Sequence, residues 1–174
     1  MSKRSRIKSL IISFSLLSSA LGADPANATA LIELAPFFNG YTDACFLGNE
    51  IGRTFISWLH PLDDKGSLGT KPALPLRFAA ALGDPVAVNR EDHWHYTVPV
   101  KAATFNGVKT VAIERWSGKD NGISGFAIVF DAPAAVVNAA FKRVKFTSDE
   151  HDVRAILYFD KATGKSSLLC DSSD

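Results

Sequence analysis

The second half of the chain is dominated by short segments in which apolar positions alternate with polar ones or follow one another without interruption. Such segments predict strands, and five are present: 93–105, 108–116, 126–130, 153–159 and 166–170. The first two flank Asn106-Gly107, a dipeptide that favours a two-residue hairpin because both residues accept positive φ. Pro99 cannot donate to a sheet ladder, so we expect its strand to lie at an edge or to contain a bulge.

The first third of the chain after residue 30 follows a helical period instead. Its clearest helix carries one apolar stripe at i, i+4, i+7 and i+8, made by Ile51, Phe55, Trp58 and Leu59. Asn49 is suited to cap this helix, and Pro61 ends it. Two further helices are expected at 36–47 and 76–82, separated from each other by this central helix and by an irregular loop at 61–75.

One more helix is expected directly after the apolar strand 126–130. Asp131 can accept the first free backbone N–H groups, and Pro133 suits a first helical turn. The apolar stripe of this helix would comprise Val136, Val137, Ala140 and Phe141. The pattern as a whole predicts an α+β fold, in which a helical N-terminal third packs on a mainly antiparallel sheet of five or six strands with one inserted helix.

Residues 1–28 have the three-part layout of a secretory signal peptide. A basic start is followed by the uncharged apolar segment 10–21 and then by small residues. The apolar segment is too short for a membrane-spanning helix, which needs about 20 residues. Cleavage is expected after Ala28, with Gly22 and Ala23 as alternatives, and residues 29–174 would form a single α+β domain exported to the periplasm or secreted.

The charge of the chain changes when this segment is removed. The formal net charge of +1 loses the four positive charges of Lys3, Arg4, Arg6 and Lys8 and the negative charge of Asp24, and becomes −2. Because no basic patch remains, the sequence does not indicate a nucleic-acid partner or attraction to an anionic membrane. No membrane anchor is expected after cleavage.

Cys45 and Cys170 are the two cysteines of the chain. An exported protein with an even number of cysteines usually pairs them, so we expect a Cys45–Cys170 disulfide. The alternative is a nucleophilic cysteine, which would need a lowered pKa and a neighbouring base, and no local motif indicates either.

The candidate chemistry lies in Asp92-His93-Trp94-His95-Tyr96. In a strand, His93 and His95 would share one face while Trp94 and Tyr96 point into the core. Two imidazoles at this spacing can share a metal ion if a third ligand is supplied, for which the candidates are Asp92, Glu114, His60 and His151. The alternative is an edge strand whose polar residues discourage aggregation.

Two functions remain open on the sequence alone. The first is a non-catalytic exported protein that binds another protein or an envelope component through the loop 61–75, the hairpin tip Asn106-Gly107 and nearby aromatic residues, Trp116 among them. The second is a small metal-binding protein or hydrolase that uses His93 and His95. No cofactor is indicated, and the first reading is preferred because an active site needs more convergent polar groups than the sequence offers.

Overall fold

The computed structural model describes residues 31–173, so the expected signal peptide lies outside the described residues. Seven strands form one sheet: β1 (Ile32–Glu33), β2 (Val86–Asn89), β3 (His93–Phe105), β4 (Val108–Gly118), β5 (Ser124–Phe130), β6 (Ala155–Phe159) and β7 (Ser166–Asp171). The helical elements are the 3₁₀ helix η2 (Ala35–Phe38) and the α-helices α1 (Glu50–Trp58), α2 (Leu76–Ala81) and α3 (Ala134–Phe141).

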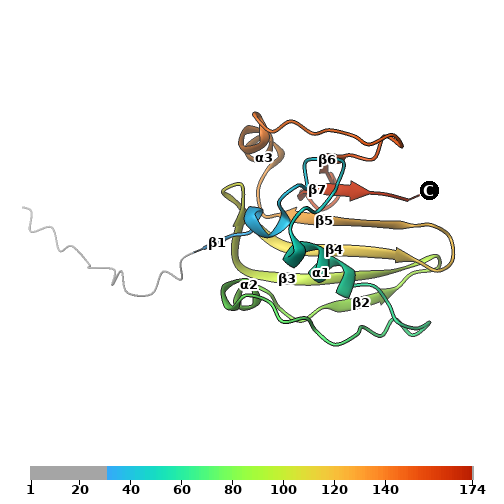
Figure 1. The fold of residues 1–174 in the computed structure, drawn as a ribbon. Coiled ribbons are helices and arrows are strands. Elements are labelled where there is room, and N and C mark those ends of the chain that lie inside the picture. Colours follow the sequence, from blue (N-terminus) through green and yellow to red (C-terminus); the bar gives the residue numbers. More distant parts are fainter. Residues whose placement is uncertain (1–30, 174) are drawn as a thin grey trace, which may run out of the picture.

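The sheet is curled and almost entirely antiparallel (Figure 1). Its strand order is β1-β3-β4-β5-β7-β6, and β2 also pairs with β3. Only β1 runs parallel to its neighbour. The last strand, β7, is inserted between β5 and β6, so β6 forms one edge of the sheet. The α+β prediction is therefore confirmed, and the two short strands β1 and β2 are additions to it.

The β3–β4 hairpin has the turn that its sequence predicts. Asn106 and Gly107 both have positive φ, at 49° and 73°. Their backbone N–H groups donate to the carboxylate of Glu33, which fastens the turn to β1. Pro99 begins the shift in register between β3 and β4 that ends at Ala103, so the expected irregularity at Pro99 is a bulge rather than an edge.

Two of the three expected N-terminal helices are confirmed. The side chain of Asn49 accepts the N–H of Ile51 at the start of α1, as expected for an N-cap. Helix α2 lies within the expected range 76–82, and no helix or strand forms between residues 61 and 75.

The helix expected over 36–47 is wrong. Helical structure ends with η2 at Phe38, and the chain turns back so that the N–H of Gly48 donates to the carbonyl of Asn39. Gly40 has φ +88°, and a Cβ there would lie 2.5 Å from the carbonyl oxygen of Phe46. Ala44 and Cys45 also have positive φ, a conformation that no right-handed helix contains.

Helix α3 also differs from its prediction in two ways. It begins at Ala134 after Pro133, because the Asp131 carboxylate pairs with Lys109 instead of capping the helix. Within the expected apolar stripe only Val137 and Phe141 are buried. Val136 is 52% exposed, so α3 leaves apolar surface facing solvent.

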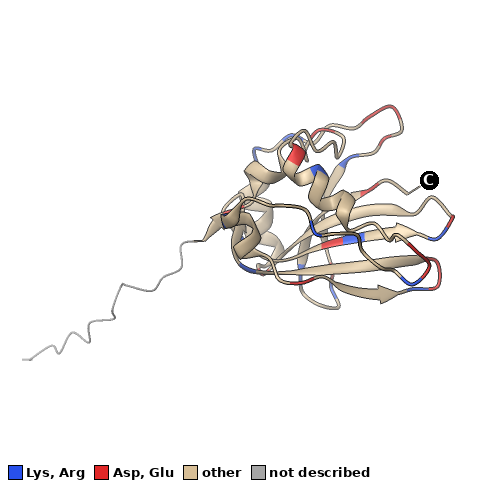
Figure 2. Ribbon diagram, turned by 60° about the horizontal axis from the view of Figure 1, so that its bottom comes forward, with Lys and Arg blue, Asp and Glu red and all other residues tan. Residues whose placement is uncertain are grey.

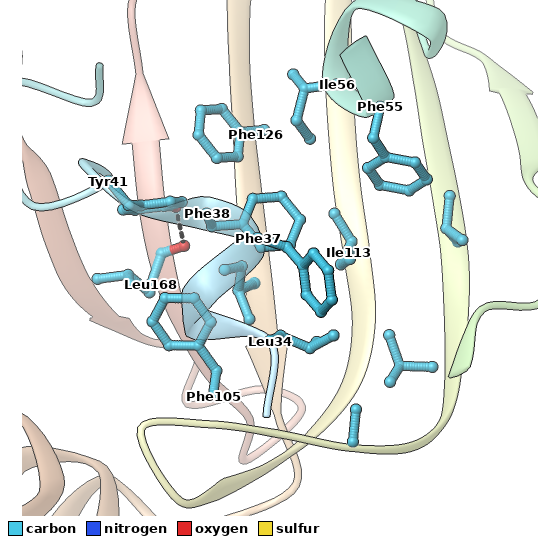
Figure 3. Packing of buried hydrophobic residues seen from close by; sticks show 14 of the residues in the cluster. Leu34, Phe37, Phe38, Tyr41, Phe55, Ile56, Phe105, Ile113, Phe126 and Leu168 are labelled. Atoms are coloured by element: carbon cyan, nitrogen blue, oxygen red, sulfur yellow. Dashed lines mark hydrogen bonds between the residues drawn. The ribbon is translucent and has the colours of Figure 1, made fainter. Parts of the chain in front are cut away.

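The core lies between the helical segments and the inner face of the sheet (Figure 3). Its centre is aromatic, with stacked and edge-to-face contacts among four rings: Phe37, Phe38, Phe55 and Phe78. Tyr41 is fully buried beside Phe126, and its hydroxyl donates to the carbonyl oxygen of Leu168 on β7 at 2.6 Å. Burial raises the pKa of Tyr41 well above its usual value.

A disulfide joins Cys45 to Cys170, with 5.8 Å between the Cα atoms and a sequence separation of 125. It connects the loop after η2 to β7, close to the Tyr41 hydrogen bond. The expected pairing is therefore present.

We expect Cys170→Ala to lower the free energy of unfolding by roughly 2–5 kcal/mol, the usual cost of losing a native disulfide in a small domain. Thermal unfolding of the wild type and of Cys170→Ala, together with Cys45→Ala as the matched partner, measures this. The two variants should lose similar stability, and a melting temperature unchanged in both would contradict a structural role for the bond.

Candidate functional site: the uncovered sheet face

The sheet has one covered and one uncovered face. Along β3, Trp94, Tyr96 and Val98 are buried under the helical segments, and the alternate residues are only partly buried. His93 and His95 therefore lie on the uncovered face, in the strand phase that the sequence predicts. The register places His95 beside Trp116 and places Thr97 beside Glu114.

A pocket of about 320 Å³ is set into this uncovered face. Its floor is apolar and consists of Ala127 and Val129 on β5 and Leu169 on β7. Trp116 and Glu114 enter it from β4, and Tyr158 enters it from β6. The turn between β6 and β7 closes one end with Asp160, Thr163 and Lys165. We call this the sheet-face pocket.

The position of Trp116 depends on Gly125. A Cβ at Gly125 would lie 2.2 Å from Cζ2 and 2.4 Å from Cε2 of the indole, so only glycine lets the ring lie against β5. The His95 ring is inclined by 23° to the indole, with 6.4 Å between the ring centroids. Trp116 thus forms a partly exposed aromatic wall, supported by backbone beneath it, beside an imidazole.

The charges of the sheet-face pocket are few and lie at its rim. Figure 2 shows that, in the part of the chain that the structure describes, charged residues gather in the loops and turns around the sheet. Glu114, Asp160 and Lys165 are the charged residues that line the pocket. The pKa of Asp160 lies below its usual value because the Thr163 hydroxyl and the Ala162 N–H donate to its carboxylate. An apolar floor with a few charges at the rim is the usual composition of a ligand site.

The two candidate metal ligands, His93 and His95, each lie close to a different carboxylate. Nδ1 of His93 lies 2.7 Å from Oδ1 of Asp92, and this hydrogen bond lowers the pKa of Asp92. Nε2 of His95 lies 3.6 Å from Oε2 of Glu114, and the two imidazole centroids are 6.2 Å apart. Among residues 31–173, no three His, Cys, Asp or Glu side chains are grouped so that they could hold a metal ion.

The other two candidate ligands are not near this pair. His60 lies at the end of α1, where its Nδ1 is 2.8 Å from the hydroxyl of Ser117. Ser117 is buried on the covered face, so this Ser–His contact joins α1 to β4 and does not present a nucleophile to solvent. His151 lies in the exposed turn before β6, at the opposite side of the sheet.

The surfaces expected to recognise a partner are also apart. The loop 61–75 packs at the start of β3, where the Gly66 carbonyl accepts the Tyr96 hydroxyl and Trp94 covers Gly66. Asn106-Gly107 lies at the other end of β3. Of the predicted aromatic residues, only Trp116 lines the sheet-face pocket. Sequence reasoning missed the pocket because its residues come from four strands whose order only the fold reveals.

Comparisons of the chain with protein-family models, with curated proteins and with solved structures found no match. In the part of the chain that the structure describes, none of the helices has the length and apolar character needed to cross a membrane.

We expect zinc to leave the melting temperature at pH 7.5 unchanged, because no third ligand from residues 31–173 is grouped with His93 and His95. Thermal unfolding with and without Zn²⁺ measures this. The contrary result would be a rise that is lost in both His93→Ala and His95→Ala and that weakens at pH 5.5, where free imidazoles with a pKa near 6.5 are mostly protonated.

Proposed function

We propose that this chain is a small, exported, non-catalytic binding protein that holds a protein or an envelope component in its sheet-face pocket. The observation that carries the proposal is the pocket itself, with its apolar floor between Trp116 and Tyr158. A partly exposed tryptophan with a polar rim around it is the usual centre of a binding surface. The ligand would carry an apolar or ring-shaped group for the floor and polar groups for the rim.

The charges at the rim bear on the chemistry of the ligand. The pocket is lined by two carboxylates, those of Glu114 and Asp160, and by one ammonium group, that of Lys165. This balance favours a ligand whose polar part carries positive charge or hydrogen-bond donors. It does not favour a polyanion.

The second candidate is a metal-binding protein or hydrolase that uses His93 and His95. The contact of Nδ1 of His93 with Asp92 supports it, because a carboxylate that holds Nδ1–H leaves Nε2 free to act as a ligand or base. The binding function is better supported, because the sheet-face pocket gathers more groups than the histidine pair does.

Export is supported by the order of residue types in residues 1–28 and by the disulfide, a bond that persists in oxidising compartments. We expect the protein isolated from cells to lack this segment, with a new N-terminus after Ala28, Gly22 or Ala23. Intact-mass measurement determines this. A protein that is folded and still begins at Met1 would contradict export by signal cleavage.

We expect Trp116→Ala to weaken the capture of the ligand from a solubilised envelope fraction by about tenfold or more, because the truncation of a central hot-spot aromatic typically costs about 2 kcal/mol or more. Immobilised wild type and variant, followed by titration of the captured component, measure this. Glu114→Gln keeps the shape of the pocket and tests the contribution of charge.

The matched control is Leu62→Ala, which removes an exposed apolar side chain from the loop 61–75. It should leave capture unchanged if the sheet-face pocket is the site. Capture that persists in Trp116→Ala and disappears in Leu62→Ala would place the binding surface on the loop instead.

A further inference from the structure

The edge strand β6 has an unusual sequence for its position. Residues 155–159 are Ala-Ile-Leu-Tyr-Phe, without proline or charge. Ile156, Tyr158 and Phe159 are each at least 42% exposed. Edge strands commonly carry charge or proline, which prevents pairing with another chain. An edge that lacks both is suited to pair with a strand.

The free backbone groups of β6 can be assigned from the β6–β7 ladder. Asp160 and Lys165 continue its register, and the N–H of Asp160 donates to the carbonyl of Lys165. Because hydrogen-bonded and non-hydrogen-bonded pairs alternate in an antiparallel ladder, Tyr158 and Ile156 also bond to β7. The N–H and C=O groups of Ala155, Leu157 and Phe159 therefore point away from the sheet.

This edge is complementary to itself. In an antiparallel pair of two β6 strands centred on Leu157, Ala155 lies opposite Phe159 and Ile156 lies opposite Tyr158. All the outward backbone groups of both strands then meet partners. The same register places Arg154 of one copy opposite Asp160 of the other, on the face that carries Ile156 and Tyr158. Among the described residues, Arg154 makes no ion pair within its own chain.

Helix α3 extends this surface on the other face of β6. Ala134, Val137 and Asn138 lie against the segment Leu157–Phe159. Its solvent side has small or apolar residues, with Ala135, Val136, Ala139 and Ala140 exposed. Small side chains let two helices approach closely, and a two-fold axis through β6 would bring α3 toward its copy.

We propose that a second copy of this chain docks on β6, so that two sheets join into one across a two-fold axis at Leu157. Three features favour a second copy as the partner. Arg154 and Asp160 have opposite charges and would lie opposite each other. The free backbone groups of the two β6 strands would meet in register, and the apolar surface of α3 would face its copy. An isologous contact of this kind closes on itself and leaves no β6 edge free.

The dimer would complete the sheet-face pocket on its open side. Tyr158 lines the pocket of its own copy, and Ile156 of the second copy lies beside it on the same face. The two pockets would then adjoin across the axis. The dimer does not depend on what the pocket binds, so its failure would leave the proposed function standing.

The test is sedimentation equilibrium of the purified protein over a range of concentrations, with the monomer mass fixed by intact-mass measurement. We expect a dimer for the wild type. Ile156→Lys should raise the dissociation constant by at least about tenfold, because it replaces the apolar contact between Ile156 and Tyr158 of the second copy with a strongly hydrated ammonium group. Arg154→Glu should also weaken the dimer, because it places a second carboxylate opposite Asp160.

Val88→Lys is the matched control. Val88 lies on β2 at the other side of the sheet, pairs with His95 on the same face, and is 39% exposed where Ile156 is 42% exposed. It should leave the dimer intact. Hydrogen exchange of the wild type adds a readout that needs no variant: the amides of Leu157 and Phe159 should become protected as the dimer forms.

Three results would overturn the proposal. The first is a wild type that remains a monomer up to its solubility limit. The second is a dimer that Ile156→Lys leaves unchanged while melting temperatures show that the variant is folded. The third is a dimer in which the Leu157 amide exchanges as fast as it does in the monomer.

Discussion

The fold depends on the fastening of the N-terminal segment across the inner face of the sheet. Tyr41 is the central contact, because its ring is buried and its hydroxyl donates to the backbone of Leu168 on the last strand. A buried hydroxyl without a partner would be costly, so this bond selects one position for the segment. The Cys45–Cys170 disulfide holds the same two parts of the chain together. The aromatic core then forms between the fastened segment and β3, β4 and β5.

This arrangement also explains why the opposite face of the sheet is uncovered. The helical elements contribute their apolar side chains to one side of the sheet, so the residues of alternate phase remain without a covering layer. On that side Gly125 leaves room for the indole of Trp116, and the small side chain of Ala127 lines the pocket beside it. The pocket therefore depends on the small side chains of β5 as well as on the larger residues that form its walls.

The parts of the fold that sequence could predict are those set by neighbouring residues. Asn106-Gly107 determines its hairpin by itself, and the period-two pattern of β3 places His93 and His95 on the uncovered face. The helix expected over 36–47 fails because Gly40 turns the chain back against Phe46, a contact that forms only in the folded loop. Asp131 does not cap α3 because its partner is Lys109 on another strand. The pocket could not be predicted, since it requires knowing that β7 lies between β5 and β6.

The central place of β7 also sets the order in which the molecule can be assembled. A chain that is synthesised N-terminus first completes β5, at residues 124–130, well before β7, at residues 166–171, and β6 only one turn before it. Until β7 arrives, β5 has an unpaired edge, β6 has no strand beside it, and Tyr41 and Cys45 lack their partners. The sheet, the disulfide and the Tyr41 hydrogen bond can therefore be completed only after residues 166–171 have been synthesised.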